Sequence, residues 1–113
     1  MIEKIIYDFL NTLDLSASVY TEMPKDVPSK LFLIERTGGN ITDHIKMANI
    51  AIKSYADTLY DAIVLNEEIK QAMLEDLIKL DDISGVKLNS DYNFTDTTTK
   101  RYRYQAVFVV TYY

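Results

Sequence analysis

The stretch Lys30-Leu31-Phe32-Leu33-Ile34-Glu35-Arg36-Thr37, with the Gly38-Gly39-Asn40 that follows it, decides how this chain folds. Its first eight residues form an apolar run of strand length. The glycine pair and Asn supply the backbone freedom that a tight turn needs. The next residues, His44 to Ser54, alternate in a way that suits a strand with both faces partly covered. A helix is the alternative interpretation of this segment, because Ala, Lys and Met favour helices. The preceding strand and turn favour the second strand of a hairpin.

A helix and a short strand precede this hairpin. Apolar residues near the N-terminus recur at steps of three and four, which places them on one face of an amphipathic helix: Ile2, Ile5, Ile6, Phe9, Leu10 and Leu13. Ala17 to Thr21 has the pattern of a short strand. Pro24 and Pro28 then favour an extended linker and exclude a central strand at that point.

A helical segment follows the hairpin. Ser54 with Asp57 three residues later resembles a capping box, with Asp in place of the usual Glu or Gln. Asn66 before two glutamates has the pattern of a second N-cap. We therefore predict a broken helix from about Tyr55 to Lys79, bent near Asn66.

The last third of the chain returns to strands. Val86 to Tyr92 predicts a short strand, and Tyr102 to Tyr113 a long one rich in residue types favoured in sheets. The prediction is an α+β fold: one domain over residues 1–113, with a mostly antiparallel sheet flanked by an N-terminal helix and the central helix. The predicted order is α-β-β-β-α-β-β.

Composition narrows the function classes. The 113 residues fit one domain, and the 48% hydrophobic content supplies a core. The 17 acidic and 12 Lys and Arg residues give a net charge of −5, which argues against a dedicated nucleic-acid binder. The chain has no Cys, which excludes disulfides and thiolate sites. No run approaches the roughly 20 apolar residues of a membrane span. The N-terminus lacks a secretory pattern, so we expect a soluble protein that stays where it is made.

Catalytic and metal-binding patterns are missing from the sequence. His44 is the only histidine, and beside a turn we interpret it as a surface residue. Asp81-Asp82 suits a solvated turn better than a cation site. The glycine pair lacks the Lys of a phosphate-binding loop. We expect neither an enzyme nor a cofactor or metal, because no set of nucleophile, base and orienting residue can be named.

Two features fit interaction surfaces. Five of the nine tyrosines lie between Tyr92 and Tyr113, and tyrosine is enriched at protein interfaces as well as in sheets. Lys100-Arg101-Tyr102-Arg103 is a basic cluster in an acidic protein. It suits either contact with an acidic partner or phosphate backbone, or a solvated hairpin arm. Interleaved arginine and aromatic residues also serve single-stranded nucleic acid, a use that the net charge disfavours.

The order of these parts resembles the tail-terminator (tail-completion) proteins of long, non-contractile-tailed bacteriophages and their prophages. The resemblance covers nearly the whole chain, from the N-terminal helix and the Met23–Pro28 connection onward. Four further segments carry it: the strand Phe32-Leu33-Ile34-Glu35-Arg36-Thr37-Gly38-Gly39, then Ile50-Ala51-Ile52-Lys53-Ser54-Tyr55-Ala56, Leu88-Asn89-Ser90-Asp91-Tyr92-Asn93-Phe94 and Tyr102-Arg103-Tyr104-Gln105-Ala106-Val107-Phe108.

The resemblance implies a helix-flanked sheet and a mechanical task in the virion. Proteins of this family close the head-proximal end of the tail tube as a ring, usually of six copies, some of them forming the ring only on the tube. They end tube growth and present the surface that joins the head. The implied partners are other copies of the chain, the tail tube protein and a head-completion or connector protein. Neither a membrane nor nucleic acid is expected, apart from DNA passing through the ring.

The contact residues are predicted from local chemistry, because the family supplies no residue-level motif. The polar loop from Asn93 to Arg101 is the segment expected to reach beyond the subunit, and the end of the predicted hairpin is the second candidate. Together they comprise Arg36, Thr37, Gly38, Gly39, Asn93, Phe94, Asp96, Thr98, Lys100, Arg101 and Arg103. Two alternatives stay open: a head-completion or head–tail adaptor protein of the same assembly, and a small ligand- or nucleic-acid-binding module.

Overall fold

The computed structural model describes residues 1–95 and 101–113 and confirms the predicted order of elements. In chain order these are α1 (Ile2–Leu10), β1 (Ser18–Tyr20), β2 (Leu31–Thr42), β3 (Ile45–Ala56), α2 (Leu59–Gln71), β4 (Ile83–Asn93) and β5 (Tyr102–Tyr112). A π-helical turn, η1 (Ala72–Asp76), and a 3-10 turn, η2 (Leu77–Lys79), extend α2 toward β4.

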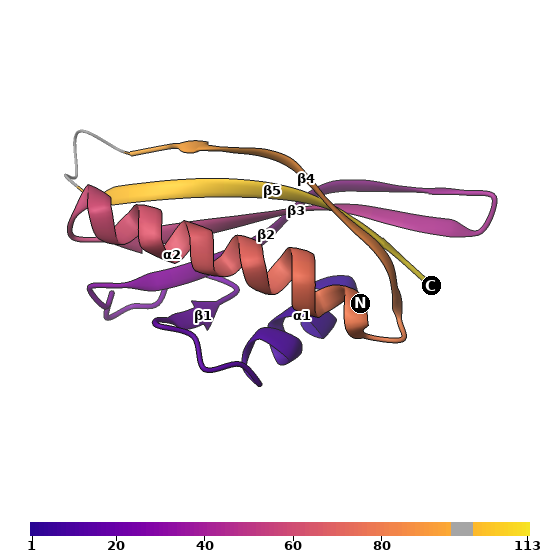
Figure 1. The fold of residues 1–113 in the computed structure, drawn as a ribbon, viewed down its shortest axis with the longest axis horizontal. Helices are drawn as coiled ribbons and strands as arrows, with labels where there is room; N and C mark the ends of the chain where they lie inside the picture. Colours follow the sequence, from indigo (N-terminus) through magenta and orange to yellow (C-terminus); the bar gives the residue numbers. More distant parts are fainter. Residues whose placement is uncertain (96–100) are drawn as a thin grey trace.

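The five strands form one sheet in the order β1-β2-β3-β5-β4 (Figure 1). The short β1 pairs with β2 in parallel, and the other neighbours are antiparallel. The last strand of the chain therefore lies inside the sheet, between β3 and β4. β4 lies at one edge. β2 forms the other edge beyond Leu33, where its pairing with β1 ends.

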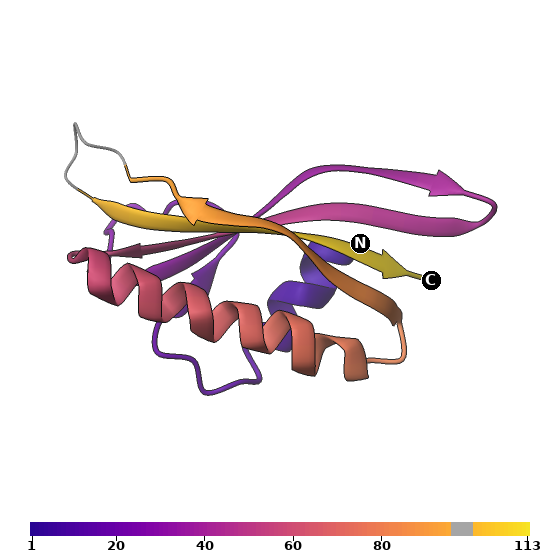
Figure 2. The ribbon, with the colours of Figure 1, turned by 45° about the horizontal axis from the view of Figure 1, so that its top comes forward.

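Both helices lie on the same side of the sheet (Figure 2). One stripe of α1 is buried there, made of Ile2, Ile6 and Leu10. Alternate residues of the two central strands complete this core: Ala48, Ile50, Ile52, Ala106, Phe108 and Val110. Because successive strand residues point to opposite faces, the residues between them face away from the helices. No helix of residues 1–95 or 101–113 lies on this side, which we call the open face.

The position of the hairpin turn corrects the sequence prediction. Gly38 and Gly39 lie within β2, not in a turn, and the strand continues to Thr42. The turn is formed by Asp43 and His44, with φ of 51° and 68°. Two residues with positive φ are typical of a two-residue hairpin loop whose twist matches the flanking strands. A bulge between Arg36 and Gly38 instead shifts the register against β3 at the place where the turn was expected.

The start and the bend predicted for the central helical segment are also wrong, whereas its predicted end at Lys79 is confirmed. Ser54, Tyr55 and Ala56 remain in β3, because β5 pairs with them. The helix begins after Thr58, whose side chain accepts a hydrogen bond from the Asp61 amide at 3.1 Å. It continues through Asn66, which is buried against the sheet, so packing overrides the N-cap pattern there. The geometry changes only from Ala72 onward.

Candidate interaction surfaces

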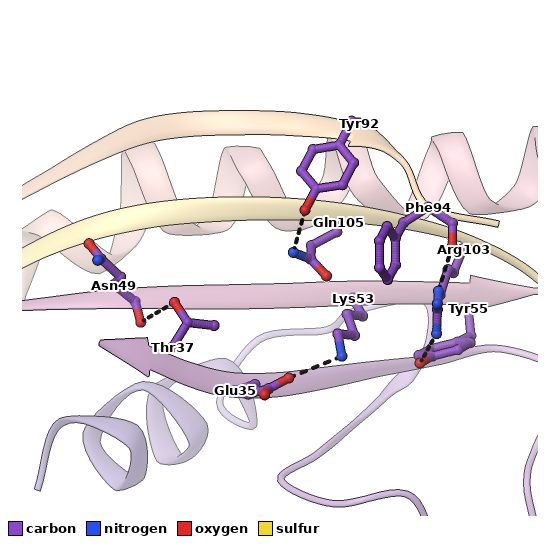
Figure 3. A network of polar contacts seen from close by, with 9 residues as sticks. All are labelled: Glu35, Thr37, Asn49, Lys53, Tyr55, Tyr92, Phe94, Arg103 and Gln105. Atoms are coloured by element: carbon purple, nitrogen blue, oxygen red, sulfur yellow. Dashed lines mark hydrogen bonds and ion pairs between the residues drawn. The ribbon is translucent and has the colours of Figure 1, made fainter. Parts of the chain in front are cut away.

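An arginine–aromatic cluster occupies one end of the open face, where β3 and β5 lie side by side. Tyr55 pairs with Arg103 in the sheet, and the guanidinium carbons of Arg101 and Arg103 each lie 5.8 Å from the Tyr55 ring centroid. The Arg103 guanidinium also lies 4.2 Å from the centre of the Phe94 ring and donates to the Tyr55 hydroxyl at 3.3 Å (Figure 3). These are cation–π contacts, in which the positive charge of each guanidinium is attracted to the face of an aromatic ring.

The two arginines of this cluster contact their own chain. Arg103 donates to the Phe94 carbonyl, and Arg101 donates to the Pro28 carbonyl at 3.0 Å. Tyr55 is buried beneath them. The basic cluster was predicted to reach outward. Its two described arginines instead bind their own chain: Arg101 binds the loop before β2, and Arg103 binds the residue that follows β4.

Further polar contacts cross the open face (Figure 3). Lys53 forms an ion pair with Glu35 at 3.0 Å, and Gln105 donates to the Tyr92 hydroxyl at 2.7 Å. Each contact joins two neighbouring strands. They therefore reinforce the β2–β3 and β5–β4 pairings on the open face.

The open face combines apolar side chains with an excess of positive charge. Leu33, Met47, Val107 and Val109 are half-buried there. Four cations and a single carboxylate lie among its described residues. The strand registers place Lys53, Lys87, Arg103 and Glu35 there, and Arg101 stacks on Tyr55 of the same face. In a chain of net charge −5, this is a local inversion of sign.

The two groups of predicted contact residues lie apart. Arg36, Thr37, Gly38 and Gly39 lie in β2. Asn93 is the last residue of β4 and Phe94 follows it, whereas Arg101 immediately precedes β5 and Arg103 lies within it. Arg36 pairs with Ile50, while Arg103 pairs with Tyr55 five residues farther along β3. Asp96, Thr98 and Lys100 lie outside the described residues. The structure thus offers two separate patches.

The Arg36–Gly39 patch is largely engaged in holding the β2 bulge. The Arg36 side chain donates to the Gly38 carbonyl at 3.3 Å, and Thr37 donates to the Asn49 carbonyl at 3.4 Å. A Cβ atom on Gly39 would lie 2.5 Å from the Met47 carbonyl oxygen. The glycine is therefore explained by close backbone approach.

Sequence reasoning missed the outer side of α2. Its inner side packs on the sheet through Ala62, Leu65 and Ile69. Five apolar side chains on the opposite side are exposed, and we call them the outer stripe: Tyr60, Ile63, Val64, Leu74 and Ile78. Tyr60 is 75% exposed. The sequence signal was present, because apolar residues on both sides of a helix indicate that both sides are to be covered.

A partly buried ion pair joins α2 to the edge strand β4. Lys70 lies 2.6 Å from Asp91 on β4 and 2.7 Å from Glu67, and its side chain is 17% exposed. Hydrogen bonds to Asp91 and then to Glu67 raise the pKa of Lys70 above its ordinary value, against the opposing effect of burial. This interaction fixes the position of the helix over β4.

The described residues hold no cluster of three or more acidic or histidine side chains that could bind a metal ion. None of the helices in residues 1–95 and 101–113 combines the length and apolarity needed to cross a bilayer. Comparison with known protein families finds no match to this chain, and comparison with curated proteins finds none either.

Proposed function

We propose that this protein is a structural assembly protein of a bacteriophage or prophage, a tail terminator. In this proposal copies of the chain form a ring on the head-proximal end of the tail tube, and the resemblance implies six copies. The ring stops the addition of tube subunits and offers the surface to which the filled head binds. The protein then resides at the head–tail junction of the virion, and DNA passes through the ring.

One observation carries the proposal: the fold is the helix-flanked sheet that the sequence resemblance implies. The elements follow the expected order, and the strand that carries the most recognisable segment, β2, forms a long hairpin with β3. This hairpin extends beyond the helices at one end of the molecule (Figure 1).

The surfaces of the subunit suit assembly into a ring. A ring needs two different patches on each copy, which meet head to tail. The open face and the outer stripe of α2 lie on opposite sides of the sheet. Apolar side chains are half-buried on the open face and exposed on the outer stripe. These two surfaces supply the distinct patches that such an assembly requires.

The test is removal of the gene from the parent phage or prophage, followed by electron microscopy of the lysate. We expect overlong tails of scattered length, unattached to filled heads, because nothing then stops tube growth. Supplying the wild-type gene from a plasmid should restore uniform tails.

Other outcomes would contradict the proposal. Tails of normal length that fail to join heads would assign the protein to a head-side adaptor. Intact infectious particles would overturn both assembly roles and favour a small binding module, for which steeply salt-dependent binding to single-stranded DNA is the distinguishing assay.

A further inference from the structure

We infer that copies of this chain associate head to tail, with the outer stripe of α2 in one copy packed against the open face of the sheet in the next. This inference deepens the proposed function, because it names the two surfaces that would form the ring contact. It rests on the exposure, the placement and the charge of described side chains.

The outer stripe is an apolar surface without a partner within the described chain. Tyr60, Ile63 and Val64 lie at helical spacing on the side of α2 turned away from the sheet. Leu74 and Ile78 extend the same side through the π-helical and 3-10 turns. Exposed apolar side chains gathered along one helix side are typical of protein–protein contact sites.

The open face provides a matching apolar surface. Val107 and Val109 lie on β5 near the middle of the sheet. Met47 lies on β3, where it pairs with Thr111 of β5. All three are half-buried, and no helix of the described chain covers them (Figure 2). A helix laid on such a sheet repeats the packing that α2 already makes on the opposite face.

Charge identifies the occupant as a second copy. The segment 59–79 carries five acidic residues and two lysines, so the outer stripe lies within an acidic surface. The open face has an excess of cations. A copy placed with its α2 on the open face of its neighbour therefore brings opposite charges together, whereas helix-to-helix or sheet-to-sheet pairing brings like charges together.

The absence of Cys allows a direct test by cross-linking, because the full chain has no thiol to interfere. The double variant Ile63→Cys/Val107→Cys, treated with a short bismaleimide, should give a ladder of dimers, trimers and larger species on a denaturing gel. Mixing the single variants Ile63→Cys and Val107→Cys should give dimers only, since each copy then offers one reactive site. Each single variant alone should stay monomeric. The same experiments with Val109→Cys cover a shift of two residues along β5, to the next side chain on the same face.

The matched control places the first cysteine at Ile41 instead of Ile63. Ile41 is another exposed isoleucine, near the tip of the β2–β3 hairpin. Ile41→Cys/Val107→Cys should give no more product than random collision. Cross-linking of Ile63→Cys with itself would overturn the inference in favour of a symmetric contact. Products no more abundant than those of the Ile41 control, with both Val107 and Val109, would overturn it outright.

A second measurement tests the energetics of the same contact. Tyr60→Lys/Val64→Lys should weaken self-association at least about tenfold, because it places two charges among the exposed apolar side chains of the outer stripe. Ile41→Lys makes the same change elsewhere and should have no effect. Circular dichroism should show unchanged folding for both, since all three positions are exposed.

The outcomes separate this inference from the proposed function. Cross-linked ladders combined with normal tails in the deletion strain would leave the contact intact and overturn the terminator role. Overlong tails combined with no specific cross-link would support a terminator whose ring uses other surfaces, and would overturn the contact.

Discussion

At the scale of single residues, the two glycines of β2 differ in what they tolerate. A Cβ atom on Gly39 would lie 2.5 Å from the Met47 carbonyl oxygen and 2.7 Å from Arg36. We expect Gly39→Ala to lower the free energy of unfolding by about 1–3 kcal/mol, because the backbone of β3 would have to shift. Urea denaturation followed by circular dichroism measures this change.

Gly38→Ala is the matched control for this prediction. A Cβ atom there would meet only the Asn49 side chain, at 3.6 Å, which is an ordinary contact. The expected change in the free energy of unfolding is within about 0.5 kcal/mol. Equal losses at the two positions would contradict the close approach at Gly39.

The same residues show why the turn was misplaced from sequence. A Gly-Gly-Asn run is a strong turn signal, and Asp43-His44 is a weak one. The cross-strand partners of β2 decide between them, and those partners come from β3. The role of Arg101 and Arg103 was equally hidden, because Tyr55, which both contact, lies more than 40 residues earlier in the chain.

At the scale of elements, Lys70 determines how α2 is held over β4. Lys70→Met removes the ion pairs to Asp91 and Glu67 and should lower the free energy of unfolding by about 1 kcal/mol at pH 7. The pKa of Lys70 is raised in the folded state, so its stabilisation is complete below the ordinary value of 10.5 and is lost as the pH rises through the folded-state value.

The measurement compares wild type and Lys70→Met by urea denaturation from pH 7 to about pH 11. The difference between the two free energies of unfolding should shrink at the alkaline end. Lys79→Met is the control, because Lys79 is 74% exposed and pairs with Asp76 on its own helical segment. It should change stability little at any pH. A Lys70 effect that stays constant up to the highest pH would contradict the assignment.

Local sequence patterns predicted which helices and strands form better than they predicted the residues at which these elements begin and end. Residue types favoured in sheets identified β5 as a strand from Tyr102 onward, and helical spacing identified α1. The start of α2 could not be predicted, because Ser54 to Ala56 stay in β3 only through pairing with the distant Tyr102 to Tyr104. The outer stripe was visible as apolar spacing. The sequence alone does not say which side of a doubly apolar helix packs within its own chain.

At the scale of the whole molecule, the net charge of −5 conceals a separation of charge between two sides. The acidic α2 segment lies on one side of the sheet, and the cationic open face lies on the other. Each subunit therefore has electrostatically distinct sides, which favours approach of the acidic side of one copy to the cationic side of another. Long-range attraction of this kind speeds encounter more than it strengthens the final complex.

This separation predicts how salt affects self-association. Raising the ionic strength from about 0.05 M to about 0.5 M should lower the association rate constant about tenfold, because salt screens charges beyond a few ångströms. The dissociation rate should change little, since apolar contacts hold the complex once formed. Stopped-flow energy transfer between donor- and acceptor-labelled Glu22→Cys protein, labelled at an exposed loop position, measures both rates.

Glu67→Gln/Glu75→Gln reduces the negative charge beside the outer stripe and should flatten the salt dependence. An association rate that does not respond to salt would show that charge separation plays no part in the encounter, and the orientation would then depend on the apolar surfaces alone.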